Sequence, residues 1–320
     1  MLPCPHPTDR LAPLFPARDY ITGDAFQVGT CSACGLAVTS PQPSGEALGR
    51  YYPPAYHGDS DDRRFPAPVE ALQRLLYRHR AGVVERVAGG KPGRVLDIGC
   101  GRGHLLDAFR RRGWEVQGTE LTEHSARFPR QVLGLPVHVG PGDALPFEPG
   151  SFDAVVMWHV LEHWPDPRLA IAEASRLLRP GGVFMVGVPN FGSPEARLCR
   201  AGWFHLDVPR HLCHLTPATL AQALAEVGLE PRRASFFAPE FDAFSFTQSI
   251  LNRLGLRPNA LYDLLRGQGA KVVAGGAEPV QAALSLFLAA PLGILSMPAT
   301  LLLGLIDQGS SVTVHAVKRG

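Results

Sequence analysis

The chain has 320 residues, of which 45% are hydrophobic and 19% are charged. A chain of this length and composition can bury a large core, which excludes general disorder. Its net charge of +2 is too small to indicate nucleic-acid binding, so we expect no nucleic-acid partner. The first residues lack the basic and apolar run of a secretory signal. We therefore expect a cytoplasmic protein whose six cysteines are not paired in disulfides.

The N-terminal part of the chain divides into two segments. Residues 1–58 are rich in proline, which predicts an irregular, loop-rich arm. The connecting segment 59–90 carries apolar residues at helical spacing, so we expect a helix over 69–87. The apolar stripe of that helix consists of Val69, Leu72, Leu76, Val83 and Val87.

Strand and helix patterns alternate from residue 94 onward. This alternation predicts an α/β domain in which parallel strands are joined by crossover helices. We assign residues 91–238 and 310–320 to this domain. Its last segment, 311–319, is a clear strand that no helix directly precedes, so it could pair antiparallel with its neighbour.

Residues 239–309 form an insertion before this last strand, and its part 279–306 contains no charged residue. The run is long enough to cross a bilayer at ~20 residues per span. Pro291 and Pro298 predict that it is divided into short helices. Because the strands on both sides belong to one sheet, the run must leave and return on the same side, which excludes a single crossing. Three interpretations stay open: peripheral membrane contact or a lid over a lipid substrate, a core or dimer contact, and true insertion.

A glycine-rich loop follows the first strand of the α/β domain and opens a helix. It reads Asp97-Ile-Gly99-Cys-Gly101-Arg-Gly103. Glycines let the backbone turn tightly and approach a ligand without a Cβ clash. The spacing is GxGxG and differs from the GxGxxG of dinucleotide-binding loops, which disfavours a nicotinamide oxidoreductase.

Two acidic residues follow the next two strands. Glu120 is placed to accept hydrogen bonds from two ribose hydroxyls. Asp143 could accept from an adenine amino group, while the amide of Ala144 donates to the ring. The pattern therefore predicts a site for an adenosine-containing cofactor.

Four segments resemble, in order, the motifs of class I S-adenosylmethionine-dependent methyltransferases. They are VLDIGCGRGHLL, QGTE, GDALPFEPGSFDAVVMWHVLEH and LLRPGGVFMVGVPN, within residues 91–238. The resemblance implies a Rossmann-like seven-stranded sheet with an antiparallel last strand, and S-adenosylmethionine as cofactor. The cofactor-binding residues that it implies are Asp97, Gly99, Gly101, Gly103, Glu120, Asp143 and Ala144.

His159, Glu162 and His163 follow the fourth strand at i, i+3 and i+4 spacing. On a helical turn they would share one face, where they could bind a metal, face the substrate or make structural contacts. The stretch resembles ubiquinone-type O-methyltransferases, which carry a carboxylate at the position of His159. This difference weakens the metal interpretation.

The loop after the fifth strand, GWFHLDVPRHLCHLTP, is rich in histidine. It resembles a W-x-x-L-D-x-P-R-H-L-x-H-x-T segment of methyltransferases that carry an N-terminal zinc-type arm. Neutral histidine is the natural general base near pH 7. We expect His211 to be the catalytic base, with His159 and His163 as further catalytic candidates. The alternative is that Arg210 and His211 only attach the loop to the domain.

The N-terminal arm contains Cys31-x-x-Cys34 and, upstream, Cys4-x-His6. Together they offer four ligands, the number that a structural Zn²⁺ ion requires. The arm resembles a zinc ribbon, although related arms have two CxxC pairs and this one has C-x-H in the first. We expect one zinc ion; the alternative is a knuckle that folds without metal.

These features and the resemblance predict an S-adenosylmethionine-dependent methyltransferase that methylates oxygen. The acceptor would be a glycan, a lipid-linked intermediate or an apolar small molecule. Peripheral contact through 279–306 would place the protein on the inner face of a membrane, and the oligomeric state stays open. A scaffold of another class, binding S-adenosylmethionine or docking to a membrane without catalysis, is the alternative.

Overall fold

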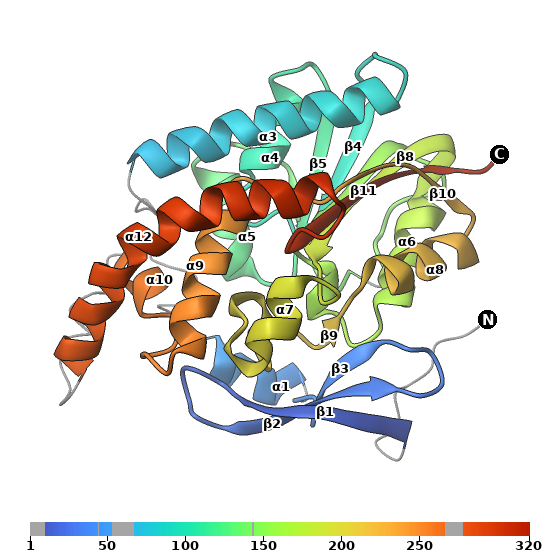
Figure 1. Cartoon of the computed structure of the whole chain (residues 1–320). Helices are drawn as coiled ribbons and strands as arrows, with labels where there is room; N and C mark the ends of the chain where they lie inside the picture. The colour runs from blue at the N-terminus through green and yellow to red at the C-terminus, as the bar shows by residue number, and fades with distance from the viewer. Residues whose placement is uncertain (1–9, 44, 53–66, 143, 266–277) are drawn as a thin grey trace.

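The computed structural model describes residues 10–43, 45–52, 67–142, 144–265 and 278–320. A seven-stranded sheet lies at its centre, with the strand order β10-β11-β8-β7-β4-β5-β6 (Figure 1). These strands are β4 (Arg94–Ile98), β5 (Glu115–Glu120), β6 (Val137–Val139), β7 (Phe152–Trp158), β8 (Leu178–Pro189), β10 (Leu229–Ser235) and β11 (Ser311–Lys318). The predicted α/β class and Rossmann-like sheet are confirmed.

The direction of the strands follows from their connections. Neighbouring strands from β6 to β8 pair in parallel, because a helix or long loop returns the chain each time. The last strand, β11, pairs antiparallel with both β8 and β10, which confirms the expected antiparallel strand. Strands β7 and β8 lie inside the sheet and are nearly continuous runs of buried apolar residues, as expected for strands covered on both faces.

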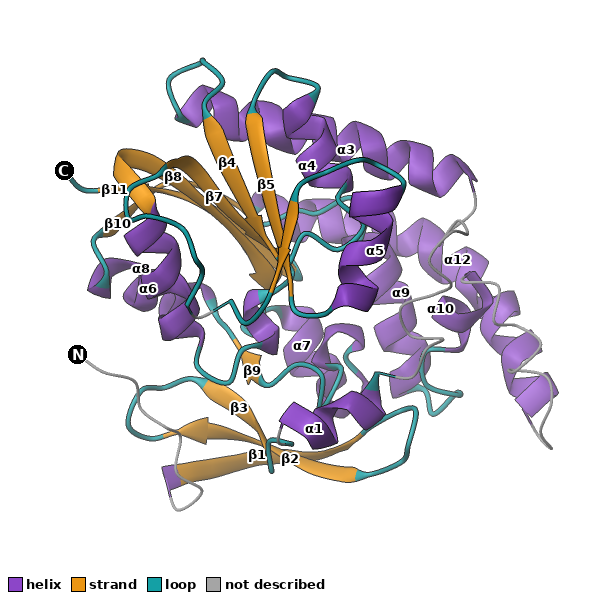
Figure 2. Cartoon of the chain, turned by 180° about the vertical axis from the view of Figure 1, so that it is seen from behind, coloured by secondary structure: helices purple, strands orange, loops and turns teal. Residues whose placement is uncertain are grey.

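Helices cover both faces of this sheet (Figure 2). One core joins the sheet to α3 (Ala67–Val87), α4 (His104–Arg110) and α5 (Glu123–Gln131). The other core joins it to α6 (Pro167–Leu177) and α8 (Pro217–Glu226). Thr216 caps α8 through its side chain, which accepts a hydrogen bond from the amide of Thr219.

A second sheet lies beside the first and has the order β1-β2-β3-β9. Its strands are β1 (Leu11–Arg18), β2 (Ala25–Cys31), β3 (Ala37–Ser40) and β9 (Cys213–His214). Two short helices, α1 (Gly45–Leu48) and η2 (Gly49–Tyr51), follow β3 in the chain. The expectation of an irregular, loop-rich arm is wrong for residues 11–40. Pro13 and Pro16 lie in β1, an edge strand, where a missing N–H group is tolerated.

The insertion before β11 is helical. It contains α9 (Asp242–Arg253), α10 (Ala260–Leu265) and α12 (Glu278–Leu305). The prediction that Pro291 and Pro298 divide the apolar run is wrong, because both lie inside the single helix α12. A proline removes one helical hydrogen bond and bends a helix without ending it, and α12 changes direction along its length in Figure 1.

Helix α12 is long and apolar enough to cross a membrane by length and composition. Only 11% of the most apolar stretch within Val280–Leu305 is buried. The interpretation of this segment as ordinary core is therefore wrong, since most of the helix faces outward.

The fully buried side chain of Arg210 joins the second sheet to the α/β domain. Its Nη2 atom lies 2.7 Å from a carboxylate oxygen of Asp19 and 2.7 Å from one of Asp207. Its Nη1 atom donates to the carbonyl oxygen of Tyr51 at 3.0 Å. A buried charge needs such complete pairing, because an unpaired one costs several kcal/mol.

We expect Arg210→Met to lower the free energy of unfolding by about 3–5 kcal/mol, since Asp19 would stay buried without its partner. Chemical denaturation measures this change. Arg232→Met is the matched control, because Arg232 pairs with Glu230 at the surface and should contribute less than about 1 kcal/mol. Equal effects of the two substitutions would contradict a structural role for the buried pair.

Candidate active site

The glycine loop lies between β4 and α4. Gly99, Gly101 and Gly103 have φ angles of 69°, 54° and 72°, which glycine adopts without steric cost. A Cβ atom at Gly99 would lie 2.8 Å from Val160, and one at Gly103 would lie 2.7 Å from Leu135. A Cβ atom at Gly101 would meet no atom within 4 Å. The loop is thus packed at two positions and open at Gly101, where a ligand can approach the backbone.

Two carboxylates lie beside this loop. Glu120, at the end of β5, accepts a hydrogen bond of 2.5 Å from the amide of Gly101. Burial, together with the charge of Glu120, raises the pKa of Asp97 to about 8, and burial also raises the pKa of Glu120. A positively charged ligand nearby would favour the ionised form of both acids.

Two further cofactor candidates, Asp143 and Ala144, follow β6 in the sequence. Asp143 lies outside the described residues. Ala144 follows it at an exposed position of the loop between β6 and β7, on the same side of the sheet as Glu120.

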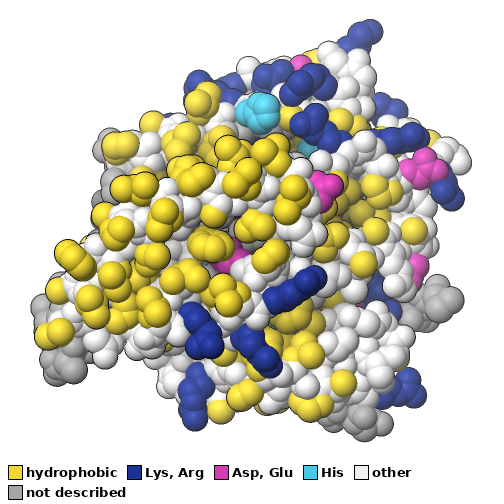
Figure 3. All heavy atoms as spheres, in the orientation of Figure 1, with side chains coloured by type: hydrophobic (Ala, Val, Ile, Leu, Met, Phe, Trp, Pro, Cys, Tyr) yellow, Lys and Arg dark blue, Asp and Glu magenta, His cyan; other side chains and the backbone are white. Residues whose placement is uncertain are grey.

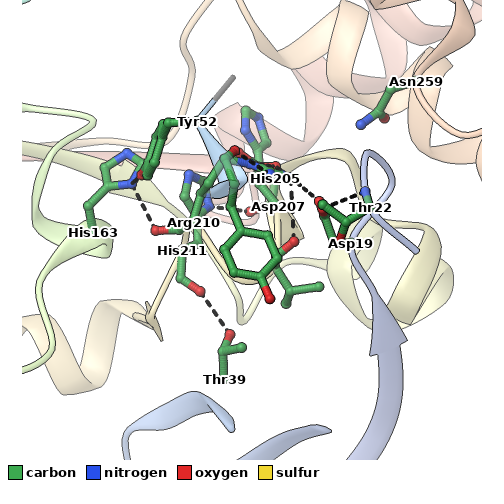
Figure 4. A network of polar contacts seen from close by, with 12 residues as sticks. Asp19, Thr22, Thr39, Tyr52, His163, His205, Asp207, Arg210, His211 and Asn259 are labelled. Carbon is green, nitrogen blue, oxygen red and sulfur yellow. Dashed lines mark hydrogen bonds and ion pairs between the residues drawn. The ribbon is translucent and has the colours of Figure 1, made fainter. Parts of the chain in front are cut away.

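A cluster of imidazoles surrounds Glu162 at the carboxyl end of β7. His159 directly follows that strand, and Glu162 and His163 belong to the short helix η3 (Leu161–His163). His205 and His211 come from the long loop after β8, which also carries η5 (Phe204–Leu206) (Figure 4). The ring centroids of His163 and His211 are 4.8 Å apart, and those of His159 and His205 are 6.1 Å apart.

Burial determines the charges in this cluster. Burial lowers the pKa of His211 to about 4 and that of His205 to about 3, so both rings are neutral near pH 7. Burial opposes ionisation of Glu162 as well, but His159, whose Nδ1 atom lies 3.3 Å from a carboxylate oxygen of Glu162, favours the ionised form and outweighs this cost. The pKa of Glu162 therefore falls to about 2, and the cluster holds one buried carboxylate.

Backbone carbonyl groups determine which ring nitrogens can accept a proton. Nδ1 of His163 lies 2.9 Å from the carbonyl oxygen of Arg210, and Nδ1 of His211 lies 2.7 Å from that of His205. A carbonyl group can only accept, so both Nδ1 atoms carry hydrogen and both Nε2 atoms keep a lone pair. Each Nε2 atom can thus take a proton from a substrate or bind a metal.

The possible metal ligands differ from the trio that the spacing suggested. Among the described residues, donor atoms of Glu162, His163 and His211 lie within 4.8 Å of one another, and His159 is not part of this group. These three residues could hold a metal ion. The reason is the fold: η3 does not continue as an α-helix from His159, whose φ angle is 52°.

Two residues that sequence reasoning missed also border the cluster. The hydroxyl of Tyr52 lies 3.2 Å from Nδ1 of His163, and the ring of Phe241 is centred 4.8 Å from that of His159. Tyr52 belongs to a Tyr-Tyr pair that was visible in the N-terminal arm. Phe241 precedes α9 in the insertion, and no sequence signal marks it.

The N-terminal sheet carries the second predicted site. Cys31 ends β2 and is buried, and the amide of Gly35 donates to its carbonyl oxygen at 2.8 Å. Cys34 lies in the same tight turn and is half-buried. Cys4 and His6 lie outside the described residues, so the structure shows half of the predicted ligand set.

Known proteins with similar sequences are methyltransferases. Residues 70–234 match the model of a family described as a methyltransferase domain. A ubiquinone biosynthesis O-methyltransferase from Thiobacillus denitrificans is 34% identical over 149 residues, which are 43% of this chain and 64% of the relative, less than two thirds of its length. A protein of the same description from Bordetella bronchiseptica is 31% identical over 178 residues, 51% of this chain and 72% of the relative.

The fold is also found in a known structure. A Galdieria sulphuraria structure assigned as a sarcosine dimethylglycine methyltransferase is 15% identical and superimposes with a TM-score of 0.50, covering 80% of this chain and 91% of that one. At this identity the likeness concerns the fold alone. With the family match over 70–234, the chain belongs to the methyltransferase domain family.

Proposed function

We propose that the protein transfers a methyl group from S-adenosylmethionine to a hydroxyl oxygen of a small-molecule acceptor, with a histidine as general base. The observation that carries this proposal is the pair of Nε2 lone pairs on His163 and His211. The short helix that carries His163 begins near the glycine loop, since the side chain of Val160, just before that helix, packs against Gly99.

The residues of the chain have two tasks in such a reaction. Bound S-adenosylmethionine supplies an electrophilic methyl group, and Asp97 and Glu120 would hold it beside the open backbone of Gly101. The protein aligns the acceptor oxygen with the methyl group and excludes water. His211 takes the hydroxyl proton at Nε2, with His163 and His159 as the other candidates.

The names of the relatives support oxygen as the methyl acceptor, since those proteins are described as ubiquinone biosynthesis O-methyltransferases. For this chain we propose an apolar, lipid-linked or glycan acceptor. The apolar surface of α12 favours the first two, and supports a cytoplasmic enzyme that contacts the inner face of a membrane through 279–306. A scaffold without catalysis is the alternative, and release of S-adenosylhomocysteine in the presence of an acceptor distinguishes them.

Gly101→Val should abolish binding of S-adenosylmethionine, because its side chain would enter the open space beside the loop. Isothermal titration calorimetry measures the affinity. Gly228→Val is the matched control: Gly228 also has a positive φ angle of 72° and open space around it, but it lies between α8 and β10. Equal loss of binding in both variants would assign the effect to backbone strain.

His211→Ala should leave the affinity for S-adenosylmethionine near normal and reduce turnover by roughly a hundredfold. Because burial holds the pKa of His211 at about 4, its ring stays neutral at higher pH, and this residue should cause no loss of turnover near pH 6.5. His79→Ala, at an exposed position of α3, is the control. Full activity of His211→Ala would transfer the role to His159 or His163.

We also propose that the N-terminal sheet binds one structural zinc ion through Cys4, His6, Cys31 and Cys34. The tight turn of Cys31 to Gly35 supports this proposal. Elemental analysis of the purified protein should find about one zinc per chain. Cys31→Ser should reduce the zinc content, whereas Cys199→Ser, a buried cysteine outside the arm, should not. Equal zinc content in both variants would contradict the site.

A further inference from the structure

Helix α12 buries its small side chains and exposes its large apolar ones, which is the opposite of a helix on the surface of a protein in water. The small or hydroxylated residues face the protein and are 1–5% exposed: Ala282, Ser285, Ser296 and Thr300. The large apolar residues face outward and are 63–76% exposed: Val280, Phe287, Ile294, Leu295, Leu302 and Leu305. A helix in water buries its large apolar side chains, whereas a helix against lipid packs through small ones.

The hydroxyl groups of α12 find their partners inside the protein. Ser285 donates to the carbonyl oxygen of Gln281 at 2.8 Å, and Thr300 donates to that of Ser296 at 2.8 Å. The hydroxyls of Ser296 and Thr247, on α9, are 2.9 Å apart. These side chains therefore need no water, which suits an apolar environment.

The fold prevents α12 from crossing a bilayer. Helix α12 packs along α9, and α9 is held in the α/β domain, where Ser245 and Ser249 donate to the buried carboxylate of Glu195 at 2.6 and 2.8 Å. After α12 the chain returns to β11, which pairs with β10. A surface helix held in this way can only lie in the plane of a membrane.

Basic residues border the apolar surface. Figure 3 shows Lys and Arg side chains on both sides of the hydrophobic face over α12, with few acidic ones. Helix α3 lies on the same side of the molecule as α12 (Figures 1 and 2). It exposes Leu72 and Leu75 together with Arg74 and Arg78. The ion pair between Arg80 and Glu240, which lies just before α9, ties this helix to the insertion.

We propose that α12 and the outer side of α3 form an in-plane docking surface for an anionic phospholipid bilayer. The outward apolar side chains would enter the acyl boundary, and the bordering arginines would lie at the phosphate groups. A symmetric dimer through the same face would bring these basic borders against each other, whereas anionic lipid complements them.

This surface is connected to the candidate active site. Helix α12 packs along α9, and Phe241, at the start of α9, contacts the ring of His159. Docking would thus hold the α9 side of the site close to the membrane. A lipid-linked acceptor would then enter the site from this side, and this consequence rests on the proposed methyl transfer. The proposal that the surface docks on a membrane does not depend on it.

Flotation with vesicles tests the proposal on the full chain. We expect the protein to float with vesicles of phosphatidylcholine and phosphatidylglycerol, and less at high salt. The double variant Phe287→Asp/Leu302→Asp changes two exposed positions and should reduce the partition by roughly a hundredfold, because charge is costly in the acyl region. Leu169→Asp, an exposed position on α6, is the matched control and should float like the wild type.

Several results would overturn the proposal. One is a wild-type protein that stays with the soluble fraction, and another is equal flotation of the double variant. A third is a dimer in sedimentation that the double variant converts to monomer, since the occupant would then be a second copy. Calorimetry with S-adenosylmethionine on the same samples separates these outcomes from a failure of the proposed function, because docking does not involve the glycine loop.

Discussion

The buried guanidinium of Arg210 is the interaction on which the arrangement of the site depends. A charge in the interior is stable only when carboxylates and carbonyl groups surround it, and here Asp19 and Asp207 supply both carboxylates. Asp19 follows β1, whereas Asp207 belongs to the loop after β8. The pairing therefore fixes that loop against the N-terminal sheet. Since the loop also carries His205 and His211, one ion-pair network determines where these imidazoles lie.

Burial in turn determines the charge of these imidazoles. Water would leave a histidine partly protonated near neutral pH, whereas burial lowers the pKa of His211 to about 4 and keeps its ring neutral. The backbone carbonyl of His205 holds the hydrogen on Nδ1 of His211. Tautomer and charge are thus both determined by the packing, and the lone pair that remains is on Nε2.

The sequence predicted the parts of the fold that depend on local patterns. The alternation of strands and helices, the glycine loop before α4 and the antiparallel β11 all follow from short segments. The interior position of Pro291 in α12 does not, because a lost hydrogen bond can be offset by packing that only the tertiary structure shows. The approach of His163 to His211 is likewise a contact between two distant loops, so their spacing along the chain could not reveal it.

Helix α9 joins α12, at the surface of the insertion, to the loop that carries His205 and His211. One side of α9 contacts this loop, where the amide of Phe204 donates to the hydroxyl of Ser249 at 2.8 Å. Another side contacts α12 through the hydroxyls of Thr247 and Ser296. Small hydroxylated residues let both neighbours approach closely, and their hydrogen bonds hold the three elements in one register. For this reason the same helix determines the orientation of α12 and the position of the loop that carries His205.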